Sequence, residues 1–159
     1  MRILITLIAI FFSTVAAAAD SQAFVLAVMP IKNSVGVKLK MEMRNVSSIP
    51  KVVYRGALPW VDGVSGARLV AFSGRLEAGS AALKPIRAVG AVFTSLVEIV
   101  IEPGASLVGD IDLEERFPGI NEILRKEDVF VFWTYLPFDT SLVKNDELSG
   151  AVFLKGRAE

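Results

Sequence analysis

Hydrophobic and polar residues alternate most regularly over residues 35–44. Every second residue of this stretch is apolar, and the residues between are glycine or charged. A period of two places the apolar side chains on one face of a β-strand and the charged ones on the other. The pattern predicts a strand with one buried and one wet face. Turn-forming residues at 45–50 end it.

Further short segments have the composition of strands and are separated by turn residues. They are residues 51–55, 68–73, 95–101, 107–113, 127–136 and 148–154. Residues 83–89 are an eighth candidate, and we expect an edge strand there because Pro85 has no N–H for a ladder bond. Residues 127–136 are apolar on both faces, which is typical of a central strand and places Trp133 in the core.

Two segments interrupt the strand pattern. Pro103 and Gly104 have the order that a type II turn requires, since the second central residue must accept a positive φ. Residues 119–126 have apolar residues at helical spacing, which predicts one or two helical turns. Seven or eight short strands with turns between them indicate an all-β fold. We expect an antiparallel β-sandwich of the immunoglobulin type, with a short helical insert near 119–126.

The first nineteen residues have the layout of a secretory signal peptide. Arg2 precedes an apolar stretch that ends in the small residues 16–19, and cleavage after Ala19 would leave residues 20–159 as one domain. The alternative is an uncleaved membrane anchor, but a spanning helix needs about 20 apolar residues and this run is shorter. The later sequence has no second stretch of that length. We expect an exported protein, periplasmic or secreted.

The composition removes whole classes of mechanism. The chain of 159 residues has no cysteine and no histidine. Disulfides, cysteine nucleophiles, Cys/His zinc sites and Ser-His-Asp triads all need these residues. Basic and acidic residues number 17 each, and loss of Arg2 with the leader leaves 16 basic residues against 17 acidic ones. This balance gives no electrostatic basis for nucleic-acid binding. No motif implies a cofactor.

A series of short motifs resembles a known family. They are residues 44–50 (RNVSSIP), 52–55 (VVYR), 56–60 (GALPW), 100–106 (VIEPGAS), 110–114 (DIDLE) and 148–152 (LSGAV). Their order over residues 33–154 is similar to that of the immunoglobulin-like β-domain that precedes the catalytic domain in deuterolysin-type metallopeptidases. The metallopeptidase motif H-E-x-x-H is absent, so the resemblance implies a fold and an accessory role and transfers no catalytic residue. The helical insert departs from the family pattern.

The densest acidic run is the candidate metal site. Asp110, Asp112 and Glu114 share one strand face if the strand continues, and three carboxylates there could bind Ca²⁺. The alternative is a solvated face. An EF-hand loop does not fit, because Glu115 stands where its glycine belongs and Asn121 where its last glutamate belongs. Asp110 and Asp112 could also form a glycosidase-type pair, but neighbours on an exposed strand supply no cleft.

The candidate binding loop contains Leu58, Pro59 and Trp60. An exposed tryptophan is a frequent anchor for partners, although Trp60 could instead fold back and cap one end of the sandwich.

Two further motif matches have simpler explanations than catalysis or glycosylation. Residues 141–144 form a Ser-x-x-Lys match in a polar connection, where a loop is favoured over a catalytic dyad. Residues 45–47 form a glycosylation sequon that is more often incidental in a turn.

The missing catalytic residue types favour binding over catalysis. The leading hypothesis is an exported, non-enzymatic β-sandwich that is a binding or accessory module for a partner protein or ligand. Its partner surface would be the loop around Trp60 or an exposed sheet edge that adds a strand. One alternative is a hydrolase that uses carboxylates without histidine or cysteine. Another is an inhibitor or assembly component for an exported hydrolase.

Overall fold

The computed structural model describes residues 22–33, 36–62, 66–74, 83–89, 95–138 and 145–156. Within them lie nine strands: β1 (Phe24–Lys32), β2 (Val37–Asn45), β3 (Lys51–Tyr54), β4 (Arg68–Gly74), β5 (Lys84–Ile86), β6 (Glu98–Ile101), β7 (Ser106–Asp112), β8 (Asp128–Tyr135) and β9 (Leu148–Leu154). The helices there are short: η1 (Arg55–Ala57), α1 (Leu113–Arg116) and α2 (Ile120–Ile123). The predicted signal peptide and the Ser-x-x-Lys match lie outside the described residues.

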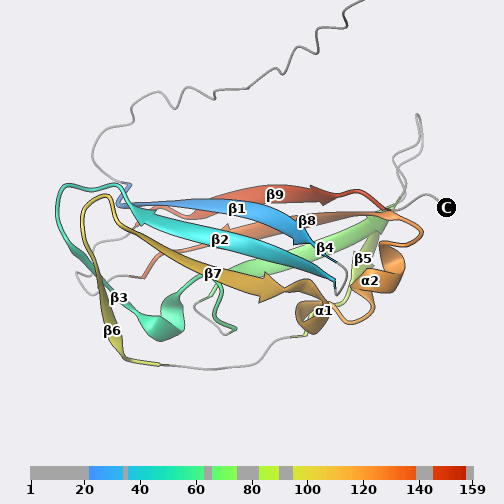
Figure 1. Ribbon diagram of the computed structural model, residues 1–159, viewed down its shortest axis with the longest axis horizontal. Helices are drawn as coiled ribbons and strands as arrows, with labels where there is room; N and C mark the ends of the chain where they lie inside the picture. The colour runs from blue at the N-terminus through green and yellow to red at the C-terminus, as the bar shows by residue number, and fades with distance from the viewer. Residues whose placement is uncertain are drawn as a thin grey trace, which may run out of the picture.

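Two antiparallel sheets form the body of the molecule (Figure 1). One has the strand order β1-β2-β7 and the other β5-β4-β8-β9, while β3 and β6 pair in a ribbon of two strands. The inner residues of both larger sheets join one hydrophobic core, to which β2 contributes Leu39 and Met41 and β8 contributes Val131 and Tyr135. The prediction of an all-β sandwich is confirmed.

The alternation that predicted β2 is confirmed from Val37 to Arg44, while Val35 lies outside the described residues. Its apolar residues from Val37 to Met43 are buried, and the charged residues between them face solvent or lie half-buried. β8 is central, with β4 and β9 on its two sides, and β5 is an edge strand as Pro85 required. Gly104 has a φ of 76°, and the N–H of Ala105 donates to the Glu102 carbonyl at 2.9 Å, which closes the predicted turn.

One long strand was not predicted. β1 pairs with the whole of β2 from Phe24 to Lys32, yet its sequence is apolar on both faces and contains Pro30. It lacks alternation because its inner face packs on the core while its outer face carries exposed apolar residues such as Met29 and Ile31. Pro30 is tolerated because β1 is an edge strand.

The helical insert closes one end of the sandwich. The prediction for residues 119–126 is confirmed by α2, and α1 immediately before it was not predicted. Their apolar residues are buried in the core: Leu113, Phe117, Ile120 and Leu124. In the part of the chain that the structure describes, no helix is long and apolar enough to cross a membrane.

The sandwich has one side where two sheet edges meet. β1 is the outer strand of one sheet and β9 is the outer strand of the other, and they run side by side (Figure 1). They are not paired as a ladder. Near their ends, the Lys32 side chain donates a hydrogen bond from Nζ to the Lys155 carbonyl at 3.3 Å. The outer edge of each strand therefore lies beside the other strand, without a hydrogen-bonded ladder between them.

Candidate functional site

The predicted binding loop is held tightly against the core. Leu58 and Pro59 are buried, and Trp60 is half-buried. The Trp60 ring lies where a side chain on Gly109 would otherwise be, so it covers the inner face of β7. The Asp62 carboxylate forms an ion pair with Arg116 of α1 at 2.7 Å, and this fixes the far end of the loop. Much of the Trp60 surface is thus used inside the molecule, and binding by residues 58–60 stays a prediction.

The acidic run is divided between a strand and a helix. β7 ends at Asp112, so Glu114 lies on α1 and does not share a strand face with Asp110. Asp112 is the N-cap of α1, and its Oδ1 accepts the N–H of Glu114 at 2.9 Å. It also pairs with Lys38 of β2 at 3.7 Å. Capping an N-terminus by aspartate satisfies N–H groups that have no partner within the helix.

Glu114 has a structural partner of its own. Its two carboxylate oxygens accept the N–H groups of Gly119 at 2.6 Å and Asn121 at 3.0 Å, which ties α1 to the start of α2. Asp110 is exposed on the outer face of β7, opposite Lys40. The described residues contain no group of three or more acidic side chains that could hold a metal ion.

The sequon asparagine, Asn45, is fully buried, and both the nitrogen and the oxygen of its side-chain amide form hydrogen bonds. Asn45 donates from Nδ2 to the carbonyls of Ile49 at 2.8 Å and Ile101 at 2.9 Å. Its Oδ1 accepts from the N–H and the hydroxyl of Ser47, at 2.9 and 2.7 Å. Glycosylation would need this amide to leave the core, so the sequon serves the turn between β2 and β3.

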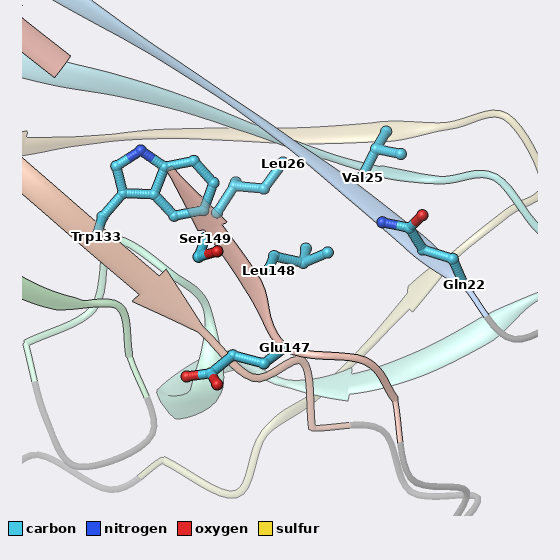
Figure 2. A pocket seen from close by; sticks show the side chains of 7 residues that line it. All are labelled: Gln22, Val25, Leu26, Trp133, Glu147, Leu148 and Ser149. Atoms are coloured by element: carbon cyan, nitrogen blue, oxygen red, sulfur yellow. The ribbon is translucent and has the colours of Figure 1, made fainter. Parts of the chain in front are cut away.

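A pocket of about 380 Å³ opens where β1 and β9 begin. Figure 2 shows the residues that line it: Gln22, Val25, Leu26, Trp133, Glu147, Leu148 and Ser149. They come from three places in the chain, namely the start of β1, the middle of β8 and the start of β9. The pocket is therefore built by the meeting of the two sheets, at the side of the sandwich where both have free edges.

Trp133 forms the apolar wall of the pocket. It is 7% exposed and lies on the inner face of β8, directly opposite Gly150 of β9. A side chain at residue 150 would approach the indole Cζ2 to 2.6 Å, so glycine is required for the ring to lie across β9. Leu26 and Leu148 extend the same apolar surface from the two edge strands.

Polar groups lie around this apolar surface. Gln22 and Ser149 supply hydrogen-bonding groups, and Glu147 supplies a carboxylate. Ligand sites commonly combine an apolar lining with a few polar groups that fix orientation. The arrangement suits an apolar side chain that enters between the edge strands, next to an amide or cationic group that meets Glu147.

Sequence reasoning missed this pocket because it missed β1. The segment 22–26 precedes the first alternating stretch, and its apolar residues resemble neither a half-buried strand nor a turn. The predicted core position of Trp133 is confirmed, but nothing in the local sequence shows that one side of its ring lies near an opening. The prediction of an exposed sheet edge was the nearest signal.

The comparisons with known proteins give no match. No family model matches the chain, and a search of curated proteins finds no significant relative.

Proposed function

We propose that the protein is an exported, non-enzymatic binding or accessory module whose partner is a protein segment. The segment would place an apolar side chain in the β1–β9 pocket and lie along the outer edge of β9 at the mouth of the pocket, where β1 forms no ladder with it. The observation that carries this proposal is a pocket with both apolar and polar lining residues, located between two edge strands whose outer edges form no ladder. Edge strands are a common docking place for extended peptides, because the backbone supplies affinity and side-chain pockets supply specificity.

The chemistry of the pocket supports binding over hydrolysis. Among its seven lining residues, Glu147 alone has an acidic or basic side chain. A hydrolase without histidine or cysteine would need two carboxylates that converge on a substrate. Asp110 and Asp112, the pair considered for that role, lie on β7, away from this pocket. No observation favours the hydrolase over the binding module.

The immunoglobulin-type assignment belongs to the same proposal. What supports it is the arrangement of three strands facing four in antiparallel sheets, together with the order of the motifs over residues 33–154. In deuterolysin-type metallopeptidases the similar domain accompanies a catalytic domain. An accessory role beside another exported protein is therefore the form of binding that we favour.

Selection of displayed peptides on the immobilised protein tests the proposal. We expect extended peptides with a large apolar residue next to lysine or arginine. Val25 lines the pocket and is 39% exposed, so Val25→Arg should abolish their binding without harm to the core. Val108, 53% exposed on β7, provides the matched control, and Val108→Arg should bind as the unaltered protein does. Equal binding by both variants would refute the pocket as the site.

A second comparison separates the pocket from the loop. Trp60→Ala should retain the selected peptides, because its ring packs against β7 and not in the pocket. If Trp60→Ala loses binding while Val25→Arg keeps it, and both are folded, the loop around Trp60 is the partner surface.

A further inference from the structure

The outer face of the β5-β4-β8-β9 sheet is apolar and aromatic. Val70, Phe132 and Phe153 are 51, 45 and 48% exposed, and Phe72 and Phe130 lie half-buried beside them. We call these five residues the aromatic face. Its rings contact one another, with centroids 6.0 Å apart for Phe72 and Phe132 and 5.0 Å for Phe130 and Phe153.

These residues form one continuous patch across neighbouring strands. The ladder places Phe72 opposite Phe130, which is opposite Phe153, and Val70 opposite Phe132. On the outer face of an antiparallel sheet, period-two alternation normally places polar residues. β2 obeys that rule with charged residues on its outer side. A contiguous exposed apolar patch marks an interaction surface, and aromatic residues are enriched at the centres of such surfaces.

Charged residues lie at both ends of the aromatic face. At one end, Arg68 begins β4 and Glu147 immediately precedes β9. At the other end, Asp128 begins β8 and Lys155 immediately follows β9. Among these four strand-end residues, each end has one positive and one negative side chain. Arg87, exposed just after β5, and the Lys84–Glu127 ion pair lie at the β5 side of the same sheet. On β9 the negative residue comes first and the positive residue last.

We infer that the aromatic face binds the same face of a second copy of this chain. A two-fold axis that crosses the strands places β9 antiparallel to its copy, so Glu147 of each copy lies opposite Lys155 of the other. The same rotation brings Arg68 next to the end of the sheet that carries Asp128. Two-fold interfaces are self-complementary, and this charge arrangement is complementary to itself in that orientation.

The size of the face sets the strength of the dimer. Three strands of seven or eight residues and the three-residue β5 cover roughly 400 Å², or about 800 Å² for two copies. Interfaces below about 1,200 Å² in total are typically weak or transient. The dimer therefore dissociates on dilution. The pocket between β1 and β9 is at the side of the sandwich, and Glu147 belongs both to its lining and to the edge of this interface.

Sedimentation velocity on the full-length protein, over roughly a hundredfold range of concentration, tests the inference. The unaltered protein shifts from monomer to dimer as concentration rises. Phe132→Arg places a charge in the centre of the aromatic face and weakens association at least about tenfold. Val108→Arg adds the same charge at an exposed valine of the other sheet and leaves association unchanged.

Charge variants test the orientation. Arg68→Glu with Lys155→Glu makes all four end residues acidic, and Asp128→Lys with Glu147→Lys makes all four basic. Each double variant repels its own copy and sediments as a monomer at low salt. Mixed in equal amounts they form a heterodimer, because every acidic residue then faces a basic one.

Three results would overturn the inference. One is a monomer at every concentration of the unaltered protein, and another is an oligomer that Phe132→Arg does not weaken. The third is a mixture of folded charge variants that fails to associate, which would reject the two-fold arrangement even if dimers form. Circular dichroism of each variant verifies folding before sedimentation.

Discussion

At the scale of single residues, buried polar side chains fix the connections between strands. Asn45 is the clearest case, because its amide bonds to Ile49, Ile101 and Ser47 and so joins β2, the following turn and β6. The same residues form a sequon in the sequence. The sequence alone could identify the turn. It could not distinguish a glycosylated asparagine from a buried asparagine that holds the turn by hydrogen bonds, because the two differ in burial and not in sequence.

Replacement of Asn45 tests this structural role. Asn45→Ala leaves the carbonyls of Ile49 and Ile101 without their donor, and we expect the free energy of unfolding to fall by about 3 kcal/mol. Ser48 is exposed in the same turn, and Ser48→Ala should cost less than about 0.5 kcal/mol. Urea denaturation measures both. Equal stability of the two variants would contradict the role assigned to Asn45.

We expect Tyr135 to make the stability of the protein depend on pH in the alkaline range. Its hydroxyl donates to the Ala57 carbonyl at 2.7 Å, and burial raises the pKa of this phenol above its ordinary value. The unfolded chain ionises first, near pH 10, so the stabilising contribution is present below that pH and is lost as pH rises above it.

The pH dependence can be measured by comparison with Tyr135→Phe. Above about pH 10, the unaltered protein should lose up to about 1.4 kcal/mol per pH unit more than the variant. At neutral pH the variant should be about 1 kcal/mol less stable, because the hydrogen bond is lost. Urea titrations at several pH values give both quantities. Parallel pH profiles would show that Tyr135 does not cause the alkaline loss.

At the scale of elements, strands were predicted correctly where one face of the strand is exposed to solvent. β2 has charged residues on alternate positions, and its period of two is visible in the sequence. β1 has apolar residues on both faces, one set buried and one exposed, so the sequence shows no period. β8 was correctly placed at the centre of a sheet, but on its outer face Phe130 is only half-buried and Phe132 is exposed. Apolar composition alone does not distinguish a covered face from an exposed one.

The helical insert depends on Glu114. Loss of its carboxylate in Glu114→Ala removes the acceptor for the N–H groups of Gly119 and Asn121, and stability should fall by about 1–2 kcal/mol. Hydrogen exchange at those two amides should become faster. Glu115 is exposed on the same helix, and Glu115→Ala should change neither quantity appreciably. If both variants behave alike, the Glu114 bonds do not hold the insert.

At the scale of the whole molecule, the sandwich has two surfaces that we propose as binding sites. The pocket lies at the side where β1 and β9 meet, and the aromatic face covers the outer side of one sheet. The fold class could be predicted from strand and turn patterns. The pocket could not, because its residues come from both ends of the chain and converge only when the two sheets pack together.

Placement of the partner segment in the pocket is tested most directly by nuclear magnetic resonance. The ¹⁵N-labelled protein would be titrated with a peptide from the selection. The largest shift changes should fall on the amides of residues 22–26 and 147–149 and on the Trp133 indole N–H. Changes confined to the Trp60 indole and residues 56–62, with the pocket signals unmoved, would contradict the proposed site.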